Sequence, residues 1–323
     1  MKKGSLIALL TVMVLMILDS RCVADSAREA LSLCAKALIP ALFPLFVLGG
    51  LLVPGLARLK IPGFARLLGF PEGGEGFFLL GCAGGYPLGA ACIAQAVERK
   101  SLDLRDSERM VGLCSLCGPS FLFGVVASIF SLEQAAVLFF LQLEAALITA
   151  AFWPKPSCSR CKIVSESVSL PAAVNRAISS TTSVCAWVTL AAVAAGFLGR
   201  WVFPFLPEPL PVMLTGLMEL TNGLFALQTL DGELRLLLCA FFLSFGGVSV
   251  HLQIAGQVTP VGIRMGQCIL QKSTHAILTT ALTFCWVQLG GMAFWIVPAV
   301  LFAKIAVEIP GGMVYNGPRK EGI

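Results

Sequence analysis

Hydrophobic residues along this chain gather in long runs that contain no charged side chain. Such runs cover residues 37–57, 76–97, 110–132, 177–199 and 273–303, and 134–154 is similar apart from Glu144. A helix needs about 20 residues to cross a bilayer, so each run is long enough. A shorter apolar run at 6–18 follows two lysines and fits either a signal peptide or a first membrane helix, of which we expect the retained helix. The pattern therefore predicts an all-α, polytopic integral membrane protein.

Composition and charge agree with this prediction. Hydrophobic residues make up 57% of the chain and charged residues 13%, against about 45–50% and about 25% in soluble domains. The net charge of +5 is small, and no dense basic block suggests a nucleic acid as partner. We therefore expect a multi-pass protein of the inner (plasma) membrane, surrounded by the lipid bilayer. The positions of its lysines and arginines then indicate the membrane topology rather than a binding partner.

A glycine-rich segment, Gly81-Cys82-Ala83-Gly84-Gly85-Tyr86-Pro87-Leu88-Gly89, interrupts the run at 76–97. Glycine and proline break helices, and a break at membrane depth leaves polar backbone groups without partners unless they face a cavity or are buried in protein. If 76–97 crossed the bilayer completely, the cations that follow at 99–109 and 155–162 would lie outside, against the tendency of cations to lie inside. We therefore predict a re-entrant hairpin over 76–97.

A weaker form of this segment occurs in the second half, where Phe241–Gly247 is similar to Phe77–Gly81 and its following glycines. It predicts a second hairpin over 236–258 and two repeats of opposite orientation. Inverted repeats whose broken helices meet near the midplane are a recurrent plan of secondary transporters. The expected division is an N-terminal transmembrane helix and connector at 1–29, a first repeat at 30–154, a cytoplasmic linker at 155–171, a second repeat at 172–310 and a tail at 311–323.

The candidate substrate-binding residues lie at these interruptions, at a further expected break at Gly118-Pro119-Ser120 and in one polar cluster. Exposed amides at the first tip could accept an anion, and Tyr86 could close a cavity. Glu219 and its neighbours offer a carboxylate, a hydroxyl and an amide, while His251 could bind substrate or relay protons. The predicted set is Gly84, Gly85, Tyr86, Pro87, Ser120, Glu219, Thr221, Asn222, Gly246, Gly247, Ser249, His251 and Gln253.

Each of these positions also has a purely structural alternative. The glycines could serve only close helix packing, and Glu219 could stand in water where Asn222 or Gly223 caps a helix. His251 could be an ordinary satisfied polar residue, and we interpret His275 as structural. Glu144 and Lys272 could simply pair with each other or with a neighbour.

No pattern of metal or catalytic residues emerges from the sequence. Cys114 and Cys117 lie in an apolar run, where cysteine behaves as a small hydrophobe. Cys158 and Cys161 lie in a basic loop without a second pair of ligands. Phosphate-binding loops, paired zinc histidines and nucleophilic serine motifs are absent from the sequence. We therefore expect no metal, no cofactor and no enzymatic activity, and an ATP-driven pump is disfavoured.

In their order, several of these motifs resemble the YlbJ-type sporulation integral membrane proteins, which belong with the nucleoside-recognition, or Gate-domain, membrane proteins. The resemblance lies in residues 27–33, 39–47, 84–90, 118–121, 219–223 and 246–253. It implies an inner-membrane protein of a spore-forming bacterium with a Gate domain akin to parts of nucleoside and ferrous-iron transporters. It also implies a role in moving dipicolinate or another small solute, such as a nucleoside-like compound, during sporulation.

The sequence thus favours a permease that works by alternating access between two hairpin tips, with a possible coupling ion. A second hypothesis is a non-transporting membrane assembly or recognition factor of the spore-forming process. A third, a membrane enzyme, would rest only on Glu144, Glu219 and His251. The oligomeric state stays open.

Overall fold

The computed structural model describes residues 3–56, 58–61, 63–153, 160–162, 167–296 and 298–300. Within these ranges the regular structure is helical, and an isolated bridge between Glu72 and Arg160 is its only β feature. The predicted all-α class is therefore confirmed. Predictions that concern Cys158, most of the linker at 155–171 or the tail at 311–323 lie outside the described residues.

Five helical segments are long and apolar enough to cross a membrane among the described residues, at 20–56, 132–151, 170–201, 232–261 and 266–295. Three expected runs, 37–57, 134–154 and 177–199, lie within or close to these segments. The expected run at 110–132 does not form one helix, because it is interrupted at 114–118. Of the run at 273–303, residues 273–289 belong to a helix that begins at Gly266 and ends at Leu289, before Gly290 with a φ of 59°.

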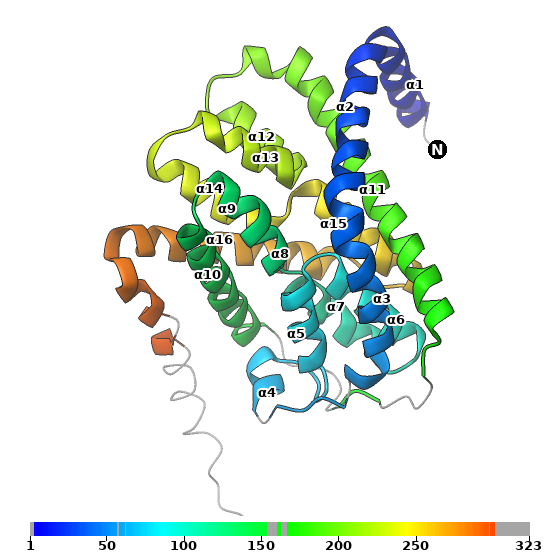
Figure 1. Cartoon of the computed structure of the whole chain (residues 1–323), viewed down its shortest axis with the longest axis vertical. Coiled ribbons are helices and arrows are strands. Elements are labelled where there is room, and N and C mark those ends of the chain that lie inside the picture. The colour runs from blue at the N-terminus through cyan, green and yellow to red at the C-terminus, as the bar shows by residue number, and fades with distance from the viewer. Residues whose placement is uncertain are drawn as a thin grey trace, which may run out of the picture.

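Among the described residues, the first half of the chain contains ten α-helices, shown from blue to green in Figure 1. The N-terminal helix α1 extends from the edge of the molecule with its side chains mostly exposed, and α2 and α3 are joined through a π-helical turn. The helices are α1 (Lys3–Leu18), α2 (Ser20–Leu33), α3 (Ile39–Leu56), α4 (Phe64–Leu68), α5 (Glu75–Gly84), α6 (Leu88–Glu98), α7 (Leu104–Leu113), α8 (Pro119–Phe121), α9 (Ala127–Ile129) and α10 (Leu132–Ala151).

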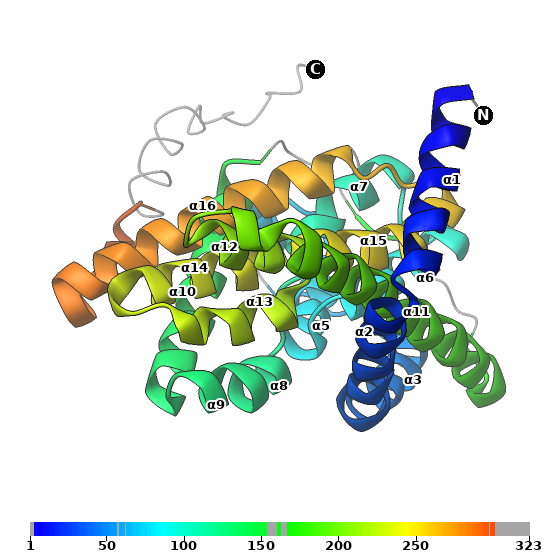
Figure 2. The same cartoon turned by 90° about the horizontal axis from the view of Figure 1, so that it is seen from above.

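The second half shares part of this order of elements. Its helices are α11 (Leu170–Trp201), α12 (Leu210–Met218), α13 (Leu220–Ala226), α14 (Gly232–Phe245), α15 (Gly247–Val258) and α16 (Gly266–Leu289). In each half a long helix, α3 or α11, precedes a pair of short helices, a broken helix and a final long helix, α10 or α16. The corresponding long helices also contact each other, α3 with α11 and α10 with α16. Figure 2 shows α11 passing beside α2 and α3.

The second pair of short helices is not where the sequence placed the second hairpin. It is formed by α12 and α13, which pack on each other, whereas 232–258 is a helix broken at Gly246 and Gly247. The halves of that broken helix have different main partners, α16 for α14 and α11 with α6 for α15. Residues 210–226 therefore form a pair of packed short helices, whereas residues 236–258 belong to the broken helix.

Glycine contacts explain which helices pair. The backbones of Gly81 and Gly89 approach each other between α5 and α6, and Gly216 contacts Gly223 between α12 and α13. The ring of Phe242 lies directly against Gly216. The double phenylalanine of the second half thus packs on a hairpin instead of forming one, so its similarity to Phe77-Phe78 does not mark equivalent elements.

Candidate functional site

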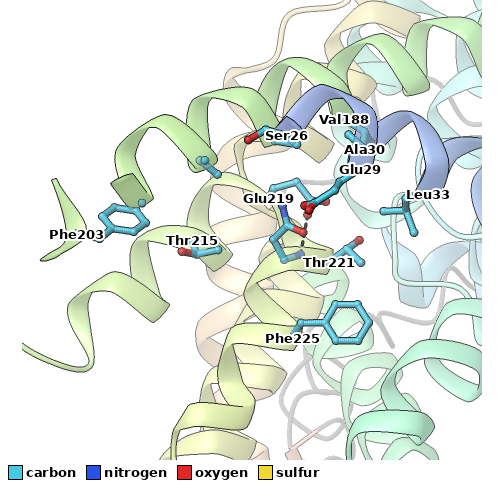
Figure 3. A pocket seen from close by; sticks show the side chains of 15 residues that line it. Ser26, Glu29, Ala30, Leu33, Val188, Phe203, Thr215, Glu219, Thr221 and Phe225 are labelled. Atoms are coloured by element: carbon cyan, nitrogen blue, oxygen red, sulfur yellow. Dashed lines mark hydrogen bonds between the residues drawn. The ribbon is translucent and has the colours of Figure 1, made fainter. Parts of the chain in front are cut away.

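Two adjoining cavities lie where the turns of both short-helix pairs face α2, α3 and α11. The first has a volume of about 280 Å³ and is lined by apolar side chains of several helices together with the tip residues Gly84, Gly85 and Tyr86. The second has a volume of about 400 Å³ and is more polar (Figure 3). Leu33, Val188, Glu219 and Thr221 line both, so the two cavities share a wall.

The turn between α5 and α6 closes one side of the first cavity. Gly85 has φ 74° and ψ −178°, a conformation that is essentially restricted to glycine. Its Cα lies close to the backbone of Gly118, and the Tyr86 amide donates a hydrogen bond to the Leu116 carbonyl at 2.8 Å. The hairpin tip is therefore held directly against the interruption that follows α7.

That interruption, residues 114–118, takes several carbonyl oxygens out of helical hydrogen bonding, and donors from other elements satisfy those of Ser115, Leu116 and Cys117. The Cys114 oxygen faces the backbones of Gly81 and Gly89, and the Cys117 oxygen accepts from Nε2 of Gln142 on α10 at 2.9 Å. The Ser115 oxygen accepts from Nζ of Lys272 on α16 at 2.8 Å. Buried carbonyls need such partners wherever water is absent. The break is thus built by four helices together.

One alternative from the sequence was that Lys272 pairs with Glu144, but the two side chains do not form an ion pair among the described residues. Its side chain is fully buried, and besides the Ser115 carbonyl its ammonium lies 5.3 Å from the centre of the Tyr86 ring. A cation over an aromatic face is favourable. Glu144 lies on α10, and its Oε2 has no hydrogen-bond partner among the described residues. Lys272 therefore links α16 to both the break and the hairpin tip.

Glu219 occupies the turn between α12 and α13. Its carboxylate accepts from the Asn222 amide at 2.7 Å, so it caps the amino end of α13, and the residue is only 4% exposed. A helix amino end is a favourable place for a carboxylate. The alternative in which Glu219 stands in water beside a helix end capped by Asn222 or Gly223 is wrong, because α13 continues to Ala226. Figure 3 shows Glu219 and Glu29 on the wall of the second cavity.

The second broken helix contributes less to the cavities than the sequence suggested. Nδ1 of His251 lies 2.9 Å from the Gly247 carbonyl, and its imidazole packs 4.6 Å from the Phe245 ring. Ser249 is fully buried and accepts from Nε2 of Gln253 at 3.1 Å. Of these residues, only Gln253 lines one of the two described cavities.

The predicted residues thus fall into three groups. Gly84, Gly85, Tyr86, Ser120, Glu219, Thr221 and Gln253 line the first cavity, and Asn222 lines the second with Glu219 and Thr221. Pro87, Gly246, Gly247, Ser249 and His251 line neither cavity. Gly247 instead packs against the backbone at the end of α12.

Sequence reasoning missed the wall that α2 and α11 provide. Ser26, Glu29 and Leu33 come from α2, and Val188 comes from α11. The available signal was the amphipathic character of 20–33, where polar side chains recur among apolar ones before the long apolar run. No group of three or more potential metal ligands of the histidine, cysteine, aspartate and glutamate types is found among the described residues.

An ion pair just outside the apolar spans ties α7 to the start of α16. The guanidinium of Arg264 donates from Nε to Oε1 of Glu108 at 2.8 Å and from Nη2 to Oε2 at 3.2 Å. These hydrogen bonds hold the pKa of the Glu108 carboxyl below its usual value, against the opposing effect of its burial. The pair thus anchors the helix whose carboxyl end carries the break.

Comparison with known proteins gives one relative. The sporulation integral membrane protein YlbJ of Bacillus subtilis (strain 168) is 30% identical over 108 residues, which are 32% of this chain and 26% of that protein. The match therefore spans about a quarter of the relative's length. No family model and no solved structure matches the chain. Together with the apolar helices, this likeness identifies the chain as a membrane protein related to a sporulation integral membrane protein.

Proposed function

We propose that this protein is a permease-like membrane protein that binds a small solute in the paired cavities. The observation that carries the proposal is that two short-helix turns, Gly84–Tyr86 and Glu219–Thr221, line the two adjoining cavities. Both turns come from helix pairs that are too short to cross a bilayer. We interpret these pairs as re-entrant hairpins of two inverted, Gate-like repeats, an arrangement that in secondary transporters surrounds the substrate.

The satisfied backbone at 114–118 supports this interpretation. Irregular backbone at membrane depth is tolerated only where it is buried in protein or lines a cavity. Here Gln142, Lys272 and the Tyr86 amide donate to the carbonyls of Cys117, Ser115 and Leu116, and Gly118 itself lines the first cavity. The broken helix is thus compatible with a position inside the bilayer.

The charges on the cavity walls narrow the class of solute. Glu29 and Glu219 line the second cavity, and neither lining contains a lysine or arginine among the described residues. Opposite charges attract strongly in a partly dry site and like charges repel. We therefore infer that a neutral or cationic solute, such as a nucleoside-like compound, suits the site better than a dianion such as dipicolinate.

Flux into proteoliposomes tests the proposal. Purified full-length protein is reconstituted, and uptake of uridine, adenosine and dipicolinate is compared for wild type, Glu219→Gln and Thr221→Val. The exposed Glu133→Gln on α10 is the matched control. Saturable uptake of a nucleoside that both cavity variants impair and the control leaves intact is the expected result. Uptake that the cavity variants leave at the wild-type rate contradicts the proposed site.

The same assay addresses the alternative of a non-transporting assembly or recognition factor for spore formation. Such a factor would move none of the three solutes and would show no saturable binding of them. Absence of both uptake and binding, in protein that is folded by its thermal transition, would favour that alternative over a permease.

A further inference from the structure

The ammonium of Lys272 is an unusual feature, because it is a fully buried charge that has no carboxylate partner among the described residues. Its side chain is 0% exposed, and none of the ion pairs among the described residues includes it. Burying a charge is costly unless polar groups compensate it. The groups that do so are the Ser115 carbonyl at 2.8 Å and the Tyr86 ring, whose centre is 5.3 Å away.

The position of the ammonium relative to α7 explains what compensates the charge. The helix ends at Leu113, so the Ser115 carbonyl lies just beyond its carboxyl end. The carboxyl end of a helix carries partial negative charge and favours a cation. In membrane transporters, unwound carbonyls and half-helix carboxyl ends are the groups that bind a dissolved sodium ion.

Further oxygens at the same break lack donors. Oγ of Ser115 and Oε1 of Gln142 are buried and have no hydrogen-bond partner among the described residues. Gln142 already donates its Nε2 to the Cys117 carbonyl of this break. The break therefore offers several oxygen atoms of the kind that bind an alkali cation, and the lysine supplies the positive charge there.

We propose that Lys272 is a tethered cation, which takes the place of a dissolved Na⁺ or K⁺ at the break between α7 and α8. The ammonium contacts the carbonyl of the break and the aromatic ring of the hairpin tip, so one fixed charge holds both together. Closure of the α5–α6 tip on the break then needs no bound alkali cation. The inference concerns how this half of the molecule is held closed, and it does not depend on whether a solute is transported.

Thermal unfolding of the purified full chain in detergent tests this inference. Apparent Tm values are compared in sodium, potassium and N-methylglucamine chloride at equal ionic strength. Since a ligand stabilises only the state that it binds, the wild-type Tm should agree within about 1 °C among the three salts. Lys272→Ala should have a lower Tm in N-methylglucamine and regain part of the loss in sodium or potassium.

Lys272→Met is the matched control, because methionine fills the space without leaving room for an ion. It should be less stable than wild type in all three salts and indifferent to the cation, whereas Lys272→Arg should keep most of the stability. Specific stabilisation of wild type by sodium or potassium would overturn the proposal. So would a Lys272→Met variant as stable as wild type, or a folded Lys272→Ala variant that ignores the cation. If Lys272→Ala does not fold, the wild-type comparison and the Lys272→Met and Lys272→Arg variants still decide the question.

Discussion

Replacing Gly85 by alanine should open the first cavity at the hairpin tip. Gly85 has φ 74° and ψ −178°, where a side chain costs about 1–3 kcal/mol. A Cβ atom there would also lie 2.7 Å from the nitrogen and 3.0 Å from the Cα of Gly118. Overpacking of this kind costs about 1–3 kcal/mol, and no rotamer change can relieve it because the neighbour is backbone.

Added together, the two effects predict that Gly85→Ala lowers the free energy of unfolding by about 2–6 kcal/mol. The chain can avoid part of this cost only by moving the tip away from Gly118. That movement would break the 2.8 Å hydrogen bond from the Tyr86 amide to the Leu116 carbonyl. Loss of stability and loss of solute binding should therefore appear together.

Thermal unfolding of purified protein, followed by circular dichroism at one fixed scan rate, measures the effect. Gly124→Ala is the matched control, since Gly124 lines the same cavity but a Cβ there meets no atom within 4 Å. Because alanine favours a helix over glycine by about 1 kcal/mol, the control should be neutral or slightly stabilised. A Gly85→Ala variant with the Tm of wild type would refute the reasoning.

Three further outcomes are expected from the same structure. Gln142→Leu should lower stability by about 1–3 kcal/mol, because it leaves the buried Cys117 carbonyl without its donor; an unchanged Tm in thermal unfolding would contradict this. Gly223→Ala should separate α12 from α13, since no side chain fits against the backbone of Gly216. The sensitivity of residues 210–226 to proteases should therefore rise. Gly4→Ala is the control, because a Cβ atom at Gly4 meets no atom within 4 Å. The lowered pKa of Glu108 contributes stability above the carboxyl's unfolded value of about 4.3 that is lost as the pH falls through the folded value. Glu108→Gln should therefore reduce the acid sensitivity of Tm, and equal slopes for the two proteins would argue against it.

Much of the candidate site follows from local chemistry. The tip at Gly84–Tyr86 could be predicted because glycine and proline interrupt an apolar run, which is a property of adjacent residues. Glu219 and Thr221 could also be predicted locally, because they are polar residues in an apolar part of the sequence. His251 and Ser249 were chosen by the same logic, yet they hydrogen-bond within α15 and line neither cavity. A break in a helix is local, but the direction in which its side chains point depends on the helices packed around it.

The sequence alone determined the class of this protein, because bilayer-length apolar runs and helix-breaking residues leave few alternatives to a helical membrane protein. Only the tertiary structure decided which short helices pair and what satisfies the broken backbone. The pairing of α12 with α13 depends on the contact between Gly216 and Gly223, and the Ser115 carbonyl is satisfied by Lys272, 157 positions away. Such contacts form between surfaces that come together only when the helices pack, so no local pattern records them.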